Sequence, residues 1–204
     1  MPFVGGIIEL GTQMSFCRLS NGKILVIDTC QISIEAKAEI DKLTENGDLI
    51  EAVIATHPFH TLYFVPFFLL YPNARYYGTP RHLTNISEIP WAGDISKPEV
   101  LNAWEPDVSM RIPAGAEFVK PESHFSGVFV FHKQSRMIHS DDTICYFDAH
   151  NTGCVLSCCV GIKPGSMFFH TSMKEGNGLY PTADAPQQFK QWVEEIIRDW
   201  DFDR

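Results

Sequence analysis

The pattern of apolar and polar positions predicts a domain built from both strands and helices. Residues 23–28, which end in the carboxylate of Asp28, and residues 51–55 form largely apolar runs typical of strands buried on both faces. Asn21-Gly22 favours a hairpin between the first run and a strand expected at residues 14–19. Further strands or apolar strand-like segments are expected at residues 3–10, 75–78, 117–119, 127–132, 136–140 and 167–169.

Apolar residues at helical spacing predict helices at residues 34–45 and 58–70. In the first helix, the residues that can share one apolar face are Ile34, Ala38, Ile40 and Leu43. In the second, Pro58 suits the first helical position because its missing N–H costs no hydrogen bond there. Pro66 is expected to kink the second helix.

A third helix is expected at residues 185–199. Its apolar stripe is formed by Phe189, Trp192, Val193 and Ile196, with Ile197 alongside. Residues 84–108 are expected to be a loop with short helical turns. Strands early and in the middle of the chain, with helices between and after them, indicate one layered domain of mixed α/β class over residues 1–204.

The composition is that of a single globular domain. The 204 residues are 45% hydrophobic and 20% charged, which excludes intrinsic disorder. The longest apolar run, residues 62–70, is too short for a membrane span. The amino terminus does not resemble a secretory signal, so a cytoplasmic protein is expected. A formal charge of −9 argues against a nucleic-acid partner and leaves a small-molecule substrate or ligand, with the oligomeric state open.

The six cysteines are expected to be reduced thiols. They form no paired C-x-x-C array, and no signal peptide points to an oxidising compartment. An alternative is a soft-metal site formed by His150, Cys154, Cys158 and Cys159, but this spacing matches no closed zinc site.

Two histidines at the end of a predicted strand are candidate metal ligands. His57 ends the strand at residues 51–55, and His60 follows three residues later on the same face of the expected helix. Two imidazoles in this arrangement can converge on one ion. The alternative is that one of them caps the helix or binds a backbone carbonyl.

Two more candidates lie in predicted turns. His124 precedes the strand expected at 127–132, and Asp142 follows the strand at 136–140. A surface histidine and an ordinary turn aspartate are the alternatives. His170 is open between a strand-end ligand and a loop residue, whereas Asp28 and His139 are expected to be structural. The sequence has no nucleophile elbow, P-loop or dinucleotide-binding glycine motif.

Four segments occur in an order that is informative as a set. Residues 21–29 end in Ile-Asp-Thr, and residues 55–60 read Ala-Thr-His-Pro-Phe-His. Residues 123–127 read Ser-His-Phe-Ser-Gly, and residues 137–142 read Met-Ile-His-Ser-Asp-Asp. This series resembles the metallo-β-lactamase superfamily, whose motifs include Thr-His-x-His-x-Asp-His at a strand-to-helix turn. A sub-group with a reduced histidine motif and a Tyr-Pro-Asn-Ala segment, like residues 71–74 here, is similar throughout.

The resemblance implies a four-layer αβ/βα sandwich with metal bound at the edge between two sheets. Carried over by position, His57, His124 and Asp142 match metal ligands, and His60 could replace a lost one. Thr61 and Leu62 follow where the family has an Asp-His pair, which puts ordinary two-ion hydrolysis in doubt. In many relatives a segment like residues 200–203 leads into a final strand with another ligand histidine. The chain is therefore expected to lack that last strand, by truncation or by nature.

Two functions from different classes follow. The first is a degenerate metal site that holds one zinc ion rather than two, with iron as the alternative metal, and hydrolyses an ester, thioester, amide or phosphoester. The second is a catalytically inactive member of the fold that acts as a binding or scaffold domain without metal. A third interpretation, an iron redox protein that uses the clustered cysteines, has less support.

Overall fold

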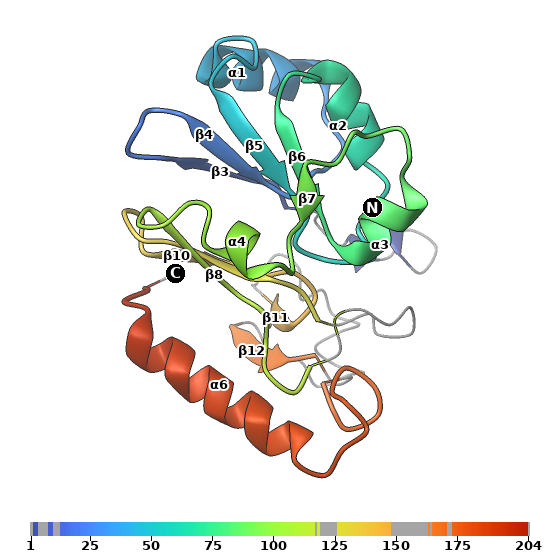
Figure 1. Ribbon diagram of the computed structural model, residues 1–204, viewed down its shortest axis with the longest axis vertical. Coiled ribbons are helices and arrows are strands. Elements are labelled where there is room, and N and C mark those ends of the chain that lie inside the picture. Colours follow the sequence, from blue (N-terminus) through green and yellow to red (C-terminus); the bar gives the residue numbers. More distant parts are fainter. Residues whose placement is uncertain are drawn as a thin grey trace.

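Two β-sheets packed face to face form the centre of the computed structural model (Figure 1). The structure describes residues 2–3, 8–9, 13–116, 118, 126–147, 163, 165–170 and 173–203. The candidate ligand His124 and the alternative site of His150 with Cys154, Cys158 and Cys159 lie outside these residues.

The first sheet has the order β3-β4-β5-β6-β7. Its strands are β3 (Ser15–Arg18), β4 (Ile24–Ile27), β5 (Ile50–Ile54), β6 (Arg75–Gly78) and β7 (Gly93–Asp94). Strand β3 is antiparallel to β4, as the Asn21-Gly22 turn predicts, and the other neighbours are parallel. The carboxyl ends of β4, β5 and β6 therefore lie along one edge of the sheet.

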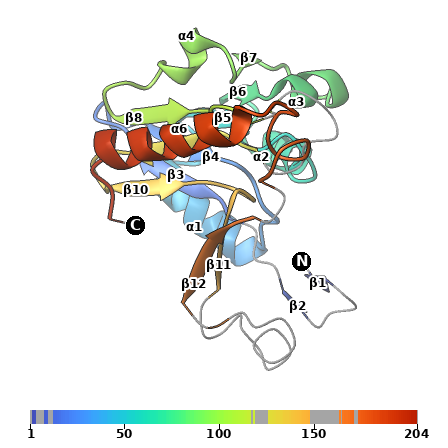
Figure 2. The ribbon, with the colours of Figure 1, turned by 90° about the horizontal axis from the view of Figure 1, so that it is seen from below.

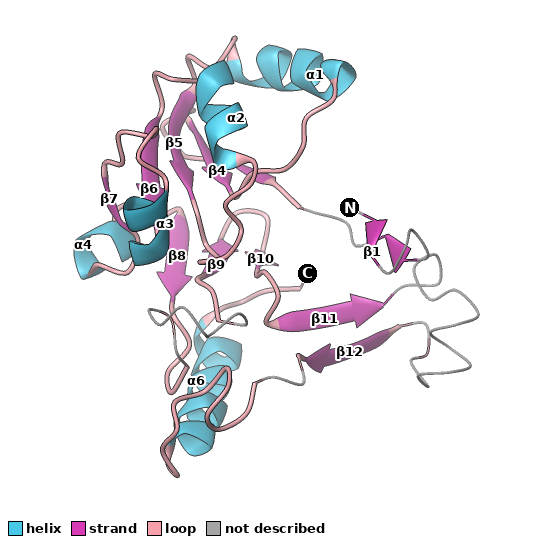
Figure 3. Ribbon diagram, turned by 90° about the vertical axis from the view of Figure 1, so that its right-hand side faces the viewer, coloured by secondary structure: helices cyan, strands magenta, loops and turns pink. Residues whose placement is uncertain are grey.

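The second sheet is antiparallel, with the order β10-β9-β8. Its strands are β8 (Val108–Arg111), β9 (Phe129–His132) and β10 (Met137–His139). A separate hairpin of β11 (Ile144–Phe147) and β12 (Ser166–Phe169) projects away from both sheets (Figures 2 and 3). Strands β8 and β11 were not predicted from the sequence, because strands of only four residues leave little pattern.

Helices cover the outer face of each sheet. The helices are α1 (Ile34–Thr44), α2 (Phe64–Leu70), α3 (Pro80–Asn85), α4 (Pro98–Leu101) and α6 (Ala185–Asp199). Helices α1 and α2 lie over the first sheet, and α6 crosses the second (Figure 1). None of the described helices has both the length and the apolar composition needed to cross a bilayer.

Three apolar cores separate the layers. Strand β4 shows the principle: Leu25 and Ile27 pack toward the second sheet, whereas Ile24 and Val26 pack under α1 and α2. Both faces of the strand are buried, as its continuous apolar run predicts. Phe129 and Phe131 of β9 complete the third core against α6. The predicted order of layers, αβ/βα, is confirmed.

Helix α2 differs from its prediction. Residues 58–63 form turns, and the helix begins only at Phe64. Pro66 therefore sits in the first turn, where the backbone N–H of a helix has no intrahelical partner, so no kink is needed.

The apolar face predicted for α1 was also wrong. Ile34 is 86% exposed and Leu43 is 42% exposed, whereas Ile40 and Thr44 are buried. Thr44 can lie inside because its hydroxyl donates a hydrogen bond to the Ile40 carbonyl. In α6, Ile197 is likewise exposed while the rest of the predicted stripe faces the core.

The amino-terminal segment is not one continuous strand from 3 to 10. The two described pieces, β1 (Pro2–Phe3) and β2 (Ile8–Glu9), pair with each other in antiparallel fashion.

Candidate metal centre

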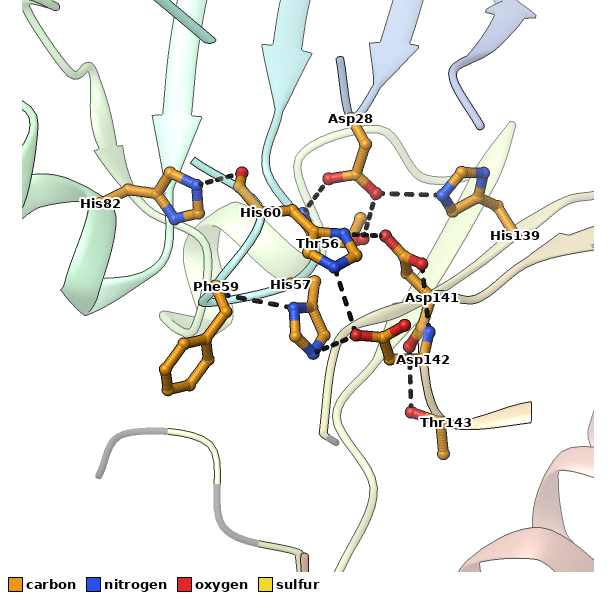
Figure 4. A network of polar contacts seen from close by, with 10 residues as sticks. All are labelled: Asp28, Thr56, His57, Phe59, His60, His82, His139, Asp141, Asp142 and Thr143. Carbon is orange, nitrogen blue, oxygen red and sulfur yellow. Dashed lines mark hydrogen bonds and ion pairs between the residues drawn. The ribbon is translucent and has the colours of Figure 1, made fainter. Parts of the chain in front are cut away.

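The ends of three parallel strands bring the candidate residues to one edge of the first sheet. Asp28 follows β4, His57 follows β5, and α3 with His82 follows β6. The loop after β10 carries Asp141 and Asp142 to the same place from the second sheet (Figure 4). The site is therefore formed between the two sheets.

His57, His60 and Asp142 converge in space despite their separation along the chain. The Oδ2 atom of Asp142 lies 3.2 Å from Nε2 of His60 and 3.8 Å from Nε2 of His57. One ligand atom from each residue lies within 4.8 Å of the others. The two imidazole rings are 4.3 Å apart between centroids.

Asp141 holds the other side of the His60 ring. Its Oδ2 makes a short hydrogen bond with Nδ1 of His60. A carboxylate on the far nitrogen fixes the orientation of an imidazole and leaves Nε2 to face a metal. Asp141 therefore positions a candidate ligand without belonging to the cluster.

His82 fixes the backbone at His60. Its Nε2 lies 3.1 Å from the His60 carbonyl oxygen, and its Nδ1 lies 2.8 Å from the Thr79 hydroxyl. Burial lowers the pKa of His82 to about 4, so this ring is neutral and Nε2–H donates to the carbonyl. Gly78 lets α3 pack this closely, because a Cβ there would lie 2.7 Å from the Cβ of His82.

Asp28 is buried and binds protein groups, as predicted. Its carboxylate accepts a 2.7 Å hydrogen bond from the backbone N–H of Thr56 and a short one from the Thr56 hydroxyl. His139 contacts the same carboxylate through Nε2 at 3.0 Å. Because Thr56 precedes His57, Asp28 fixes the backbone from which the His57 side chain projects.

The ring of His57 is fully buried beside the second sheet. Val128 donates its backbone N–H to the Thr56 carbonyl at 2.8 Å. Gly127 makes this approach possible, since a Cβ there would lie 3.1 Å from that carbonyl oxygen. The Phe59 N–H donates to Nδ1 of His57 at 3.3 Å.

The two histidines of the cluster differ in charge. Burial, reinforced by the neighbouring His60, lowers the pKa of His57. Burial also opposes the charge of His60, but its hydrogen bonds to Asp141 and Asp142 outweigh that effect and raise its pKa to about 10. The neutral imidazole of His57 therefore lies beside the positively charged imidazolium of His60, and both face the carboxylate of Asp142.

The donor set fits a divalent metal ion. In a tetrahedral zinc site with bonds of about 2.0–2.1 Å, neighbouring ligand atoms lie roughly 3.3 Å apart. The separations of 3.2 and 3.8 Å from Asp142 to the two imidazoles are close to that value. Two imidazoles and a carboxylate could thus hold an ion after small side-chain shifts and loss of the His60 proton.

The sequence identified three members of the cluster but missed two residues that support it. Asp141 looked like an ordinary turn residue, and His82 had no partner in the sequence. The pairing of Asp141 with His60 depends on contact between the two sheets, which no local pattern encodes. His170 donates its backbone N–H to the Thr143 carbonyl, so it lies beside the Asp142 loop, but its side chain is not part of the described cluster.

Comparisons with known proteins give a likeness of fold. No protein-family model matches the chain, and no curated protein matches its sequence. The chain is similar to two crystal structures of DIM-1 metallo-β-lactamase, one of them exposed to ceftazidime, each 14% identical to it. The first match covers 67% of this chain and 62% of the other, with a TM-score of 0.43. The second covers 93% and 96%, with a TM-score of 0.42. At 14% identity this likeness concerns the fold alone.

Proposed function

We propose that the chain binds one zinc ion through His57, His60 and Asp142 and is a metal-dependent hydrolase with slow turnover. The observation that carries this proposal is the convergence of the three ligand atoms within 4.8 Å. His124 is proposed as a further ligand from its sequence position alone. Iron is the alternative metal, because imidazole and carboxylate ligands suit both ions.

The proposed reaction is hydrolysis of an ester, thioester, amide or phosphoester. A bound zinc ion would supply hydroxide near neutral pH and polarise the oxygen of the carbonyl or phosphoryl group. His57, His60 and Asp142 would fix the ion at the edge of the sheets. Asp141 would keep Nε2 of His60 directed at it, and Asp28 would keep the His57 backbone in place through Thr56.

Slow turnover is proposed because the loop between β5 and α2 carries few acid–base groups. Thr61 and Leu62 follow His60 and supply neither a carboxylate nor an imidazole. Asp141, a further carboxylate at the site, is already hydrogen-bonded to His60. One well-placed acid or base is worth about 10²–10⁴-fold in rate.

Hydrolysis of an activated ester or thioester tests this proposal. We expect slow turnover that a chelator abolishes and that added zinc restores, and we expect His60→Ala to abolish it as well. His132→Ala is the matched control, because His132 lies on β9 and contacts Ser135 and Arg18 rather than the cluster. Turnover that resists the chelator would refute the metal mechanism. Fast metal-dependent turnover would refute the inferred lack of acid–base groups. His170 would then be the first residue to test as the acid or base.

One observation favours the second candidate, an inactive binding or scaffold domain. The polar groups of the cluster already satisfy one another, since both nitrogens of His60 contact carboxylates and Nδ1 of His57 accepts from Phe59. Such a network can close a sheet edge without an ion. This candidate predicts that purified protein holds no stoichiometric metal after dialysis against zinc and remains equally stable with chelator.

A further inference from the structure

Arg81, on the first turn of α3, packs on the Phe59 ring, which neighbours His57 of the candidate metal centre. Its guanidinium carbon is 4.3 Å from the centroid of the Phe59 ring. Phe59 in turn lies between His57 and His60 in the chain, and its ring centroid is 6.2 Å from that of His57. The distance from the guanidinium carbon to the centroid of the His57 ring is therefore at most the sum of these two distances.

The position of Arg81 is fixed from both sides. The next residue, His82, is hydrogen-bonded to the His60 carbonyl, and the face of the Phe59 ring supports the guanidinium. A guanidinium held on an aromatic face is preorganised, so less side-chain entropy is lost when it binds a ligand.

Arg81 has an unused hydrogen-bond donor. Its Nε atom is buried and has no hydrogen-bond partner. Within the described ranges no carboxylate is within ion-pairing distance of its guanidinium, although other described arginines form such pairs with Glu51, Asp199 and Asp201. Because Nε itself is buried, a ligand would contact the rest of the guanidinium of this half-buried residue, and an oxyanion is the acceptor that a guanidinium binds best.

The local charge makes this cation notable. The chain has a formal charge of −9, and Asp141 and Asp142 both lie at the candidate centre. A negatively charged ligand approaching this edge meets repulsion from these carboxylates unless a cation offsets it. Arg81 is placed to do so on the Phe59 side of the cluster.

We propose that Arg81, supported by Phe59, binds an anionic oxygen group of the ligand, a carboxylate or a phosphate. This inference rests on the proposed function in one respect, namely that the other end of the same molecule is the ester, thioester, amide or phosphoester placed at the metal. The substrate class is then a small anionic molecule. The anion contact itself belongs to Arg81 and does not require the metal.

Titration of two anions into metal-free protein tests the contact with no contribution from bound zinc. Inorganic phosphate and succinate are the probes, and the readout is the chemical shift of the Arg81 Nε–H in protein with ¹⁵N-labelled arginine. We expect one anion or both to shift this signal in a saturable way. The probe that binds more tightly identifies phosphate or carboxylate as the preferred group.

Variants separate this role from simple packing. We expect Arg81→Gln to weaken anion binding by about tenfold or more when binding is followed by calorimetry, and Arg81→Lys to retain part of it. Arg75→Gln is the matched control, because it removes the same charge from an exposed arginine paired with Glu51. Thermal unfolding of each variant shows that it is folded, with Arg81→Lys as the conservative replacement.

Two results would overturn the proposal: no saturable shift with either anion in the wild-type protein, or equal affinity in wild-type protein and Arg81→Gln. Zinc content, measured separately, distinguishes this failure from failure of the metal site. Anion binding that depends on Arg81 in a protein that takes up no zinc supports the subsite and refutes the hydrolase. Normal zinc uptake, together with anion affinity that is the same with and without Arg81, supports the metal site and refutes the subsite.

Discussion

Both histidines at the centre are positioned by a second residue from a different part of the fold. Asp141 contacts His60 from the second sheet, and Asp28 holds the backbone before His57 through Thr56. Asp28 and Asp142 also adopt left-handed backbone conformations, with φ of 55° and 53°. Aspartate is among the few non-glycine residues that tolerate this region, which suits Asp28 directly after β4 and Asp142 in the loop after β10.

Replacing Asp141 with asparagine should weaken metal binding without removing a ligand. An amide oxygen accepts a hydrogen bond from Nδ1–H of His60 less strongly than a carboxylate does, so the imidazole is less firmly held. Loss of such an outer partner typically costs about 10–100-fold in metal affinity, and we expect a loss of that size for zinc. Competition with a chromophoric chelator measures it.

Asp201→Asn is the control for this prediction, since Asp201 is 89% exposed and pairs with Arg136 away from the site. Equal zinc affinity in wild-type protein and Asp141→Asn would show that the hydrogen bond to His60 does not support a ligand.

Elements with a clear local sequence pattern were the most predictable part of the molecule, and some short strands and element boundaries the least. The hairpin at Asn21-Gly22, the strand at β6 and the helix at α6 follow their local patterns closely. The start of α2 does not, because a proline at residue 58 fits a tight turn as well as a helix start. The proximity of His57, His60 and Asp142 could be predicted because strand ends recur at one sheet edge, whereas their supporting partners come from tertiary contact.

Helix α2 gives a direct test of where the helix begins. Pro66 is exposed in the first turn, so Pro66→Ala restores no intrahelical hydrogen bond and should lower the free energy of unfolding by no more than about 1 kcal/mol. Phe67 is 1% exposed, and Phe67→Ala should cost about 3–5 kcal/mol. Urea denaturation of both variants measures the difference. A large gain in stability from Pro66→Ala would mean that the proline strains the helix interior.

At the scale of the whole molecule, a buried ion pair joins the two sheets. Asp28 follows β4 of the first sheet and His139 ends β10 of the second, with side chains only 3% and 7% exposed. His139 also contacts the Ser15 hydroxyl of β3 at 2.9 Å. Folding lowers the pKa of Asp28, since its bonds to His139 and Thr56 outweigh burial, and the Asp28 contact raises the pKa of His139 against burial.

These shifts define a pH window. The Asp28 contribution is complete above its unfolded pKa of about 3.9 and is lost as the pH falls through its lowered folded value. The His139 contribution is complete below its unfolded pKa of about 6.5 and is lost as the pH rises through its raised folded value. The pair should therefore stabilise the fold most between about pH 4 and 6.5.

We expect His139→Gln to lower the free energy of unfolding by about 3–5 kcal/mol within this window, because it leaves Asp28 without its charged partner. The loss should be smaller at about pH 9, because the contribution of His139 falls as the pH rises above its unfolded pKa. Denaturation curves for wild-type protein, His139→Gln and the surface control His132→Gln give the comparison. A loss that is the same at both pH values would mean that His139 is neutral in the folded protein.

The count of metal ions per chain tests the central claim most directly. Protein dialysed against zinc and then against metal-free buffer should retain one zinc ion per chain by elemental analysis. His57→Ala and Asp142→Ala should retain much less than one, and His132→Ala should match the wild-type protein. Wild-type protein without stoichiometric metal, or ligand variants that retain it fully, would contradict a metal centre at His57, His60 and Asp142.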